Sequence, residues 1–111
     1  MKLLCYYTPS HKEMFNSFLK KSCDLFGEHE LISNLDEQQL SADGSFYSQG
    51  FHETVVKKLD FILSSNNWDD TEYFIFSDAD VIFTAPTQDY LMEQASGYDI
   101  VFQSDQTTYN S

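Results

Sequence analysis

The sequence predicts an α/β fold with a mostly parallel sheet flanked by helices. Strand-like and helix-like segments alternate in the order β-α-β-loop-α-β-α-β, and this alternation is typical of parallel sheets. Residues 73–83 are almost continuously aromatic and β-branched apart from a short acidic stretch, as expected of a strand buried on both faces. The 111 residues are 41% hydrophobic and include 10 Phe and 7 Tyr. That composition excludes a disordered acidic tail, and the length fits one domain at most.

The chain opens with a predicted strand and helix. Residues 2–7 have the composition of a strand. Ser10 and Glu13 form a capping-box pattern, so a helix is expected to begin at His11. Apolar residues then recur at helical spacing until Gly27, which ends the helix.

The middle of the chain contains a second strand, a loop and a second helix. Residues 30–35 are the predicted strand, residues 36–49 are mostly polar and predict a loop, and residues 49–65 predict a helix. At 100° per residue, four apolar residues of that helix fall on one face: Phe51, Val55, Leu59 and Ile62. Lys57 lies near the opposite side. Lys58 lies on the edge of the apolar stripe, so its ammonium either snorkels past the core or reaches an anion at the rim of the sheet.

After the apolar strand at residues 73–83, a third helix and a further strand are expected. Thr87 is the predicted cap of a helix over residues 88–95 that Gly97 ends. Residues 99–103 are again apolar and β-branched and predict a strand.

The net charge of −12 limits the partners. It argues against a general nucleic-acid binder, and it means that an anionic ligand needs a local cation or a bound metal. The apolar run at residues 3–7 is too short for a signal peptide or a membrane span. Two cysteines, Cys5 and Cys23, do not form a disulfide framework and are expected to be reduced, buried thiols. We therefore expect a cytoplasmic protein.

Asp78 and Asp80 follow the apolar strand at the edge where α/β sheets bind ligands. In a regular strand, residues i and i+2 point to the same side. Two neighbouring carboxylates repel each other, and a divalent ion such as Mg²⁺ or Mn²⁺ removes that repulsion while bridging to phosphate. The alternative is a pair of solvated carboxylates at a turn.

These residues carry a resemblance to a known family. The block from Phe74 to Thr84, with Pro86 and Leu91 downstream, resembles the D-x-D strand of the GT-A nucleotide-diphospho-sugar transferases, and is most similar to the glycogenin-like and xylosyl/galactosyl-transferase-like groups. The similarity extends to three further segments: residues 6–8, residues 50–59, and residues 104–105 with 109–111. It implies a GT-A fold, Rossmann-like, with sugar transfer from a nucleotide-diphospho-sugar, most often a UDP-sugar, to an acceptor hydroxyl.

The resemblance also implies roles for individual residues. Asp80 would ligate Mn²⁺ or Mg²⁺, Asp78 would contact the metal or the ribose, and Lys58 would lie near the sugar-nucleotide. Tyr7 and Thr8 would line the base and ribose pocket.

Asp105, by the same resemblance, would face the donor sugar; its alternative role is a turn or strand-end residue. The family's usual third metal ligand is a histidine late in the domain. All three histidines of this chain (His11, His29 and His52) precede the D-x-D. Residues 1–111 are therefore expected to be the N-terminal, donor-binding part of a longer GT-A domain, inactive alone and prone to self-association. The acceptor (glycan, protein or small molecule) and the stereochemistry stay open.

Two other functions compete with this interpretation. A HAD-type phosphatase also uses D-x-D after an apolar strand, with the first aspartate, here Asp78, as nucleophile. That pair normally lies on the first strand, and Thr or Val normally stands at the position of Ile82, so the sequence disfavours this class. The second competitor is a non-catalytic acidic α/β binding module.

Overall fold

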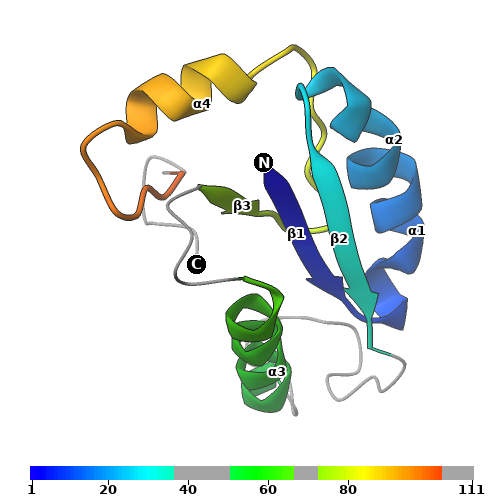
Figure 1. The fold of residues 1–111 in the computed structure, drawn as a ribbon. Helices are drawn as coiled ribbons and strands as arrows, with labels where there is room; N and C mark the ends of the chain where they lie inside the picture. The colour runs from blue at the N-terminus through cyan, green and yellow to red at the C-terminus, as the bar shows by residue number, and fades with distance from the viewer. Residues whose placement is uncertain (37–50, 67–72, 104–111) are drawn as a thin grey trace.

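The computed structural model describes residues 1–36, 51–66 and 73–103 and shows three parallel strands. They are β1 (Lys2–Tyr7), β2 (Glu30–Leu35) and β3 (Phe74–Phe76), in the order β2-β1-β3 (Figure 1). Lys2 lies opposite Glu30 on one side and opposite Phe74 on the other. The predicted α/β class, the parallel pairing, and the bounds of the first two strands are confirmed.

A continuous helical run connects β1 to β2. Its segments are η1 (Pro9–His11), α1 (Lys12–Met14), the π-helical η2 (Phe15–Leu19), α2 (Lys20–Ser22) and η3 (Cys23–Leu25). The run begins at Pro9, which fits a first helical position because proline has no N–H to satisfy there. Thr8 is the N-cap, so the predicted cap at Ser10 is wrong; the Ser10 hydroxyl lies 2.9 Å from His11 Nδ1. Gly27 follows the run as predicted, with φ +141°.

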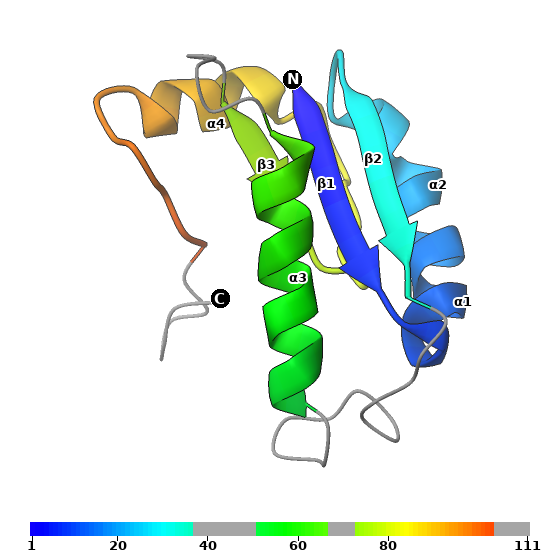
Figure 2. The ribbon, with the colours of Figure 1, turned by 60° about the horizontal axis from the view of Figure 1, so that its bottom comes forward.

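The sheet lies between this helical run and α3 (Phe51–Ser65), as Figure 2 shows. Toward the helical run, side chains from β1, the helical run and the turn after β3 form the core: Leu3, Cys5, Phe15, Leu19, Cys23, Phe26 and Ala79. On the α3 side, the rings of Tyr6 and Phe61 have centroids 5.8 Å apart, and Lys2 Nζ donates to the carbonyl of Ser65 at 3.4 Å. Alternate residues of β1 thus face different layers, as a strand requires.

The predicted apolar stripe of α3 is confirmed in part. Val55 and Ile62 are half-buried as expected, but Leu59 is 53% exposed and Lys58 and Phe61 are half-buried instead. Lys57 is half-buried as well, and does not project to the far side. The exposed Val56, Leu59 and Leu63 show that apolar residues also lie on the solvent side of this helix, so periodicity alone did not define the buried face completely. The side chain of Phe51 lies outside the described residues.

β3 is shorter than predicted. Its residues are half-buried, because β3 is an edge strand in the described part of the sheet. The Ser77 N–H still donates to Leu4 O at 2.9 Å, and the chain then turns away from β1. Val81 and Phe83, expected in the strand, instead pack onto the helix-side core, and Phe83 N–H donates to Ser22 Oγ at 2.9 Å.

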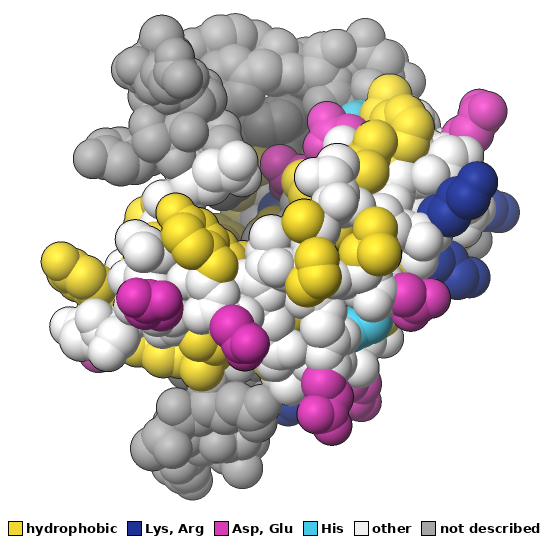
Figure 3. All heavy atoms as spheres, turned by 90° about the horizontal axis from the view of Figure 1, so that it is seen from above, with side chains coloured by type: hydrophobic (Ala, Val, Ile, Leu, Met, Phe, Trp, Pro, Cys, Tyr) yellow, Lys and Arg dark blue, Asp and Glu magenta, His cyan; other side chains and the backbone are white. Residues whose placement is uncertain are grey.

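The last described helix, α4 (Gln88–Ala95), has the predicted bounds. Thr87 is its N-cap, but the Thr87 side chain makes no capping hydrogen bond. The strand predicted at 99–103 is wrong: Ile100 is 71% exposed, and no described strand lies beside it to satisfy its backbone groups. Figure 3 shows hydrophobic side chains exposed among acidic ones on the end of the molecule seen from above.

Most of the predicted loop at residues 36–49 lies outside the described residues. None of the helices in the described ranges has the length and apolar character needed to cross a membrane.

Candidate functional site

Asp78 and Asp80 lie beyond the carboxyl end of β3, where ligands of parallel α/β sheets bind. They do not stand on a regular strand as predicted, because Ala79 and Asp80 form a turn in which Val81 N–H lies 3.4 Å from Asp78 O. Ala79 is buried in the core, and both aspartates are exposed. The expected alternation of burial is therefore present: both carboxylates lie outside the core, and the residue between them anchors the turn.

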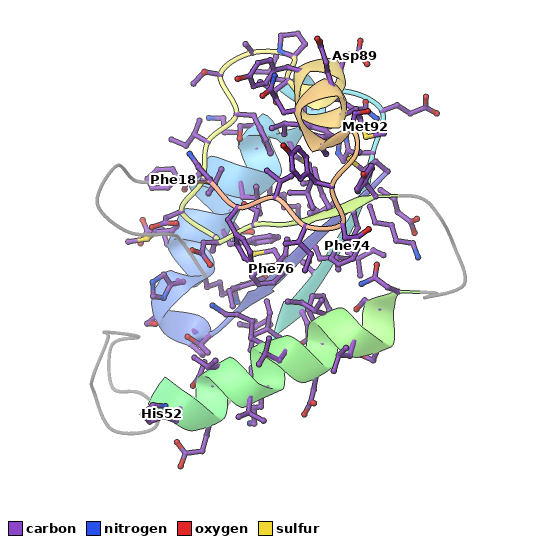
Figure 4. All side chains as sticks on the ribbon, turned by 90° about the vertical axis from the view of Figure 1, so that its left-hand side faces the viewer. Phe18, His52, Phe74, Phe76, Asp89 and Met92 are labelled. Atoms are coloured by element: carbon purple, nitrogen blue, oxygen red, sulfur yellow. The ribbon has the colours of Figure 1, made fainter. Side chains whose placement is uncertain are left out.

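Lys58 connects α3 to this turn. Its ammonium Nζ lies 3.6 Å from Asp78 Oδ1 and 5.7 Å from the ring centroid of Phe76. Figure 4 shows Phe76 and Phe74 on β3, with α3 alongside the sheet. The Lys58 side chain is 27% exposed and that of Asp78 is 54% exposed. Of the two positions considered for this lysine, the structure shows its ammonium beside an anion at the rim of the sheet.

The pKa of the Cys5 thiol is affected by burial and by three nearby charged residues. The thiol is fully buried, and burial is the main cause that raises its pKa from 9.0 to about 12. The negative charges of Asp78 and Asp80 add to this increase, whereas the positive charge of Lys58 opposes it. These three charged residues are thus near enough to Cys5 to act on it together, which places them at one end of the sheet.

The other predicted site residues are less closely connected. Tyr7 at the end of β1 packs against the core cluster that contains Ala79, and its ring stacks on Phe15 with centroids 4.2 Å apart. Thr8 is buried, with its hydroxyl 3.2 Å from that of Ser10. Asp105 lies outside the described residues.

A second polar group at this edge was not predicted. The Tyr6 hydroxyl donates to Asp36 Oδ2, and Lys57 Nζ lies 3.1 Å from the same oxygen. Burial, followed by the hydrogen bond to Asp36, raises the pKa of Tyr6. Asp36 is the first residue after β2, and its N–H donates to Tyr7 O at 2.8 Å. Its position just after a predicted strand, the same signal used for Asp78, could have identified it.

The donor set at the Asp78 turn fits a hard divalent cation. Two exposed carboxylates supply oxygen ligands only, and no third His, Cys, Asp or Glu joins them within the described ranges. Mg²⁺ and Mn²⁺ suit such a site because they commonly use one or two carboxylates and fill the remaining positions with water and phosphate oxygens.

Comparisons with known proteins identify the family. No curated protein and no solved structure matches the chain. A family model described as nucleotide-diphospho-sugar transferase matches residues 15–111, which is most of the sequence. The match includes α3, β3 and the Asp78 turn, and the parallel open sheet agrees with part of a Rossmann-like GT-A fold. The chain belongs to the nucleotide-diphospho-sugar transferase family.

Proposed function

We propose that residues 1–111 are the donor-binding part of a metal-dependent glycosyltransferase that uses a UDP-sugar and an acceptor hydroxyl. The observation that carries this proposal is the position of Lys58 and Asp78. A cation and an exposed carboxylate lie 3.6 Å apart at the carboxyl edge of a parallel sheet, in a chain whose family acts on nucleotide-diphospho-sugars. In a protein with a net charge of −12, a diphosphate needs such local positive charge.

Each residue has a distinct part in this proposal. Asp80 and Asp78 hold Mn²⁺ or Mg²⁺, which neutralises charge on the leaving diphosphate. Lys58 supplies a second cation to the diphosphate, held in place by its contact with the Phe76 ring. Ala79 fixes the turn by its burial in the core. Preorganised charge of this kind is effective because it needs no rearrangement when the leaving group departs.

Three further assignments complete the proposal. Tyr7 and Thr8, at the end of the central strand, line the base and ribose pocket. Asp105 faces the donor sugar. Both cysteines are buried free thiols, which supports a reducing compartment, the cytoplasm.

Calorimetric titration of the chain with UDP in the presence of Mn²⁺ tests the metal site. We expect saturable binding that chelator abolishes and that falls at least about tenfold in Asp80→Ala, the loss of one charge-assisted contact. Asp89→Ala is the matched control, because Asp89 is an exposed aspartate on α4 (Figure 4). Its binding should equal that of the unmodified chain.

Three outcomes would contradict the proposal. Absence of UDP binding by a folded sample would favour a binding module, and an aspartyl-phosphate trapped on Asp78 would favour a phosphatase. Efficient, metal-dependent sugar transfer by residues 1–111 alone would contradict their assignment as only the donor-binding part.

A further inference from the structure

A second group of potential ligands lies at the opposite edge of the sheet. Cys23 and Asp24 are in η3, the last turn of the helical run, and His29 directly precedes β2. The thiol, a carboxylate oxygen and a ring nitrogen of these residues all lie within 4.8 Å of one another. In the described part of the chain, no other set of three His, Cys, Asp or Glu side chains converges in this way.

A backbone contact determines which nitrogen of His29 is available to a metal. His29 Nδ1 lies 2.7 Å from Gly27 O, and a carbonyl oxygen can only accept. Nδ1 therefore carries the proton, which leaves the lone pair of the neutral ring on Nε2. Metal-ligating histidines usually donate their other ring N–H to a backbone carbonyl or carboxylate in this manner. The edge of the His29 ring also packs against Phe26, which is fully buried.

The surroundings favour a cation. The group lies at the carboxyl end of a helical run, where unsatisfied carbonyls carry partial negative charge. Asp24 is exposed, so solvent can reach the group, while Cys23 is buried beneath it. The Cys23 thiol donates to Lys20 O at 3.1 Å, which holds its sulfur at this end of the helical run.

We propose that Cys23, Asp24 and His29 bind a divalent transition-metal ion of the zinc class, with water as the fourth ligand. A thiolate, an imidazole and a carboxylate together select zinc over Mg²⁺ or Mn²⁺. Tetrahedral zinc places a thiolate sulfur and an imidazole nitrogen roughly 3.5 Å apart, so the side chains need to close by little more than ~1 Å. This site is independent of the proposed donor site and ties the end of the helical run to the start of β2.

Titration of the full chain with Co²⁺, followed by competition with Zn²⁺, tests the site spectroscopically. Cobalt bound by a thiolate gives a charge-transfer band in the near ultraviolet, and Zn²⁺ should displace it. The chain has two cysteines, so Cys5→Ser is a matched control that should keep the band, whereas Cys23→Ser should lose it. His29→Gln replaces a proposed ligand whose side chain is partly exposed. It should weaken Co²⁺ binding by more than the roughly 10–100-fold that follows loss of a group hydrogen-bonded to a metal ligand.

A thermal-stability measurement separates loss of binding from loss of folding. Zn²⁺ should raise the melting temperature of the unmodified chain and of Asp80→Ala, since a ligand that binds only the folded state stabilises it. It should not raise that of His29→Gln. The proposal is overturned if the unmodified chain shows no thiolate band, or if folded Cys23→Ser or His29→Gln binds Co²⁺ as tightly as the unmodified chain.

Discussion

The ammonium of Lys58, on α3, lies 3.6 Å from the carboxylate oxygen Oδ1 of Asp78, beyond the end of β3. These residues are far apart in sequence and belong to elements on different layers of the fold (Figure 2). Their contact places a cation at the one edge of the sheet where an anionic donor is expected. An exposed ion pair stabilises a fold by at most about 1 kcal/mol. The pair therefore contributes little to the stability of the fold, and under the proposed function the Lys58 charge serves the diphosphate of the donor.

Replacement of Lys58 by Met should weaken UDP binding about tenfold, because a charge-assisted contact contributes roughly 1.5 kcal/mol. Met keeps an unbranched side chain of similar size and removes the ammonium, and with it the contacts to Asp78 and the Phe76 ring. Calorimetry with Mn²⁺ and UDP measures the effect. Uridine, which has no diphosphate, should bind the variant and the unmodified chain equally. A matching loss of uridine affinity would show that Lys58 supports the fold of the pocket rather than the diphosphate.

Replacement of Asp36 by Ala should lower the free energy of unfolding by about 1–3 kcal/mol, since it removes the acceptor shared by Tyr6 and Lys57. The Asp36 side chain is 15% exposed, whereas that of Lys57 is 38% exposed. Lys57→Met should therefore cost less than about 1 kcal/mol. Urea denaturation of both variants checks this order; a larger loss for Lys57→Met would contradict it.

Replacement of Gly27 by Ala should destabilise the fold through two separable effects. At φ +141° an L-residue is strained, at a cost of about 1–3 kcal/mol. A Cβ there would also lie 2.8 Å from the Cβ of Gln88 at the start of α4. Adding Gln88→Ala keeps the Cβ of residue 88. The double variant should therefore regain only the stability lost to overlap with the rest of the Gln88 side chain. Full recovery in chemical denaturation would show that backbone strain is absent.

The buried Cys5 thiol should make stability depend on alkaline pH. Its folded pKa of about 12 exceeds the ordinary value of 9.0. Above pH 9 the unfolded chain therefore loses a proton that the folded chain keeps, so this contribution is complete below pH 9 and is lost as pH rises toward 12.

Cys5→Ala isolates that contribution. The difference in unfolding free energy between the unmodified chain and Cys5→Ala should shrink between pH 8 and about pH 10 in denaturant titrations, as the linkage relation requires. A difference that stays constant with pH would show that the Cys5 thiol is not protected in the folded state.

Local patterns predicted the elements well where one pattern dominated. The bounds of β1, β2 and α4, and the end of α3, follow from alternating or helical apolar residues with clear end signals such as Gly27. The buried face of α3 was predicted only in part: Val55 and Ile62 are half-buried as expected, but Leu59 is exposed. Leu59 and Lys58 differ by one position, and tertiary packing decides which of them meets the sheet. The segment 99–103 has strand composition, but strand formation needs a neighbouring strand that composition does not encode.

The sequence indicated some features of the candidate site and not others. The position of Asp78 and Asp80 just beyond β3 was predictable, because both follow an apolar run directly in the sequence; their role as ligands stays a prediction. Lys58 was suggested by its unusual place on the helix. The shared contact of Tyr6 and Lys57 with Asp36 joins three elements, and the spacing of residues in the sequence gives no measure of distances between elements. The same is true of His29 and Cys23, which a glycine turn brings together.

The central place of β1 has a consequence for how the chain folds during synthesis. β1 is made before both of its partners, because one neighbour begins at Glu30 and the other at Phe74. The pair of β1 and β2 with the intervening helical run can form early from contacts that are near in sequence. The other side of β1 must wait until β3 has been made about 70 residues later, and contacts of such long sequence separation form slowly. During that interval one edge of β1 is open to pairing with another chain.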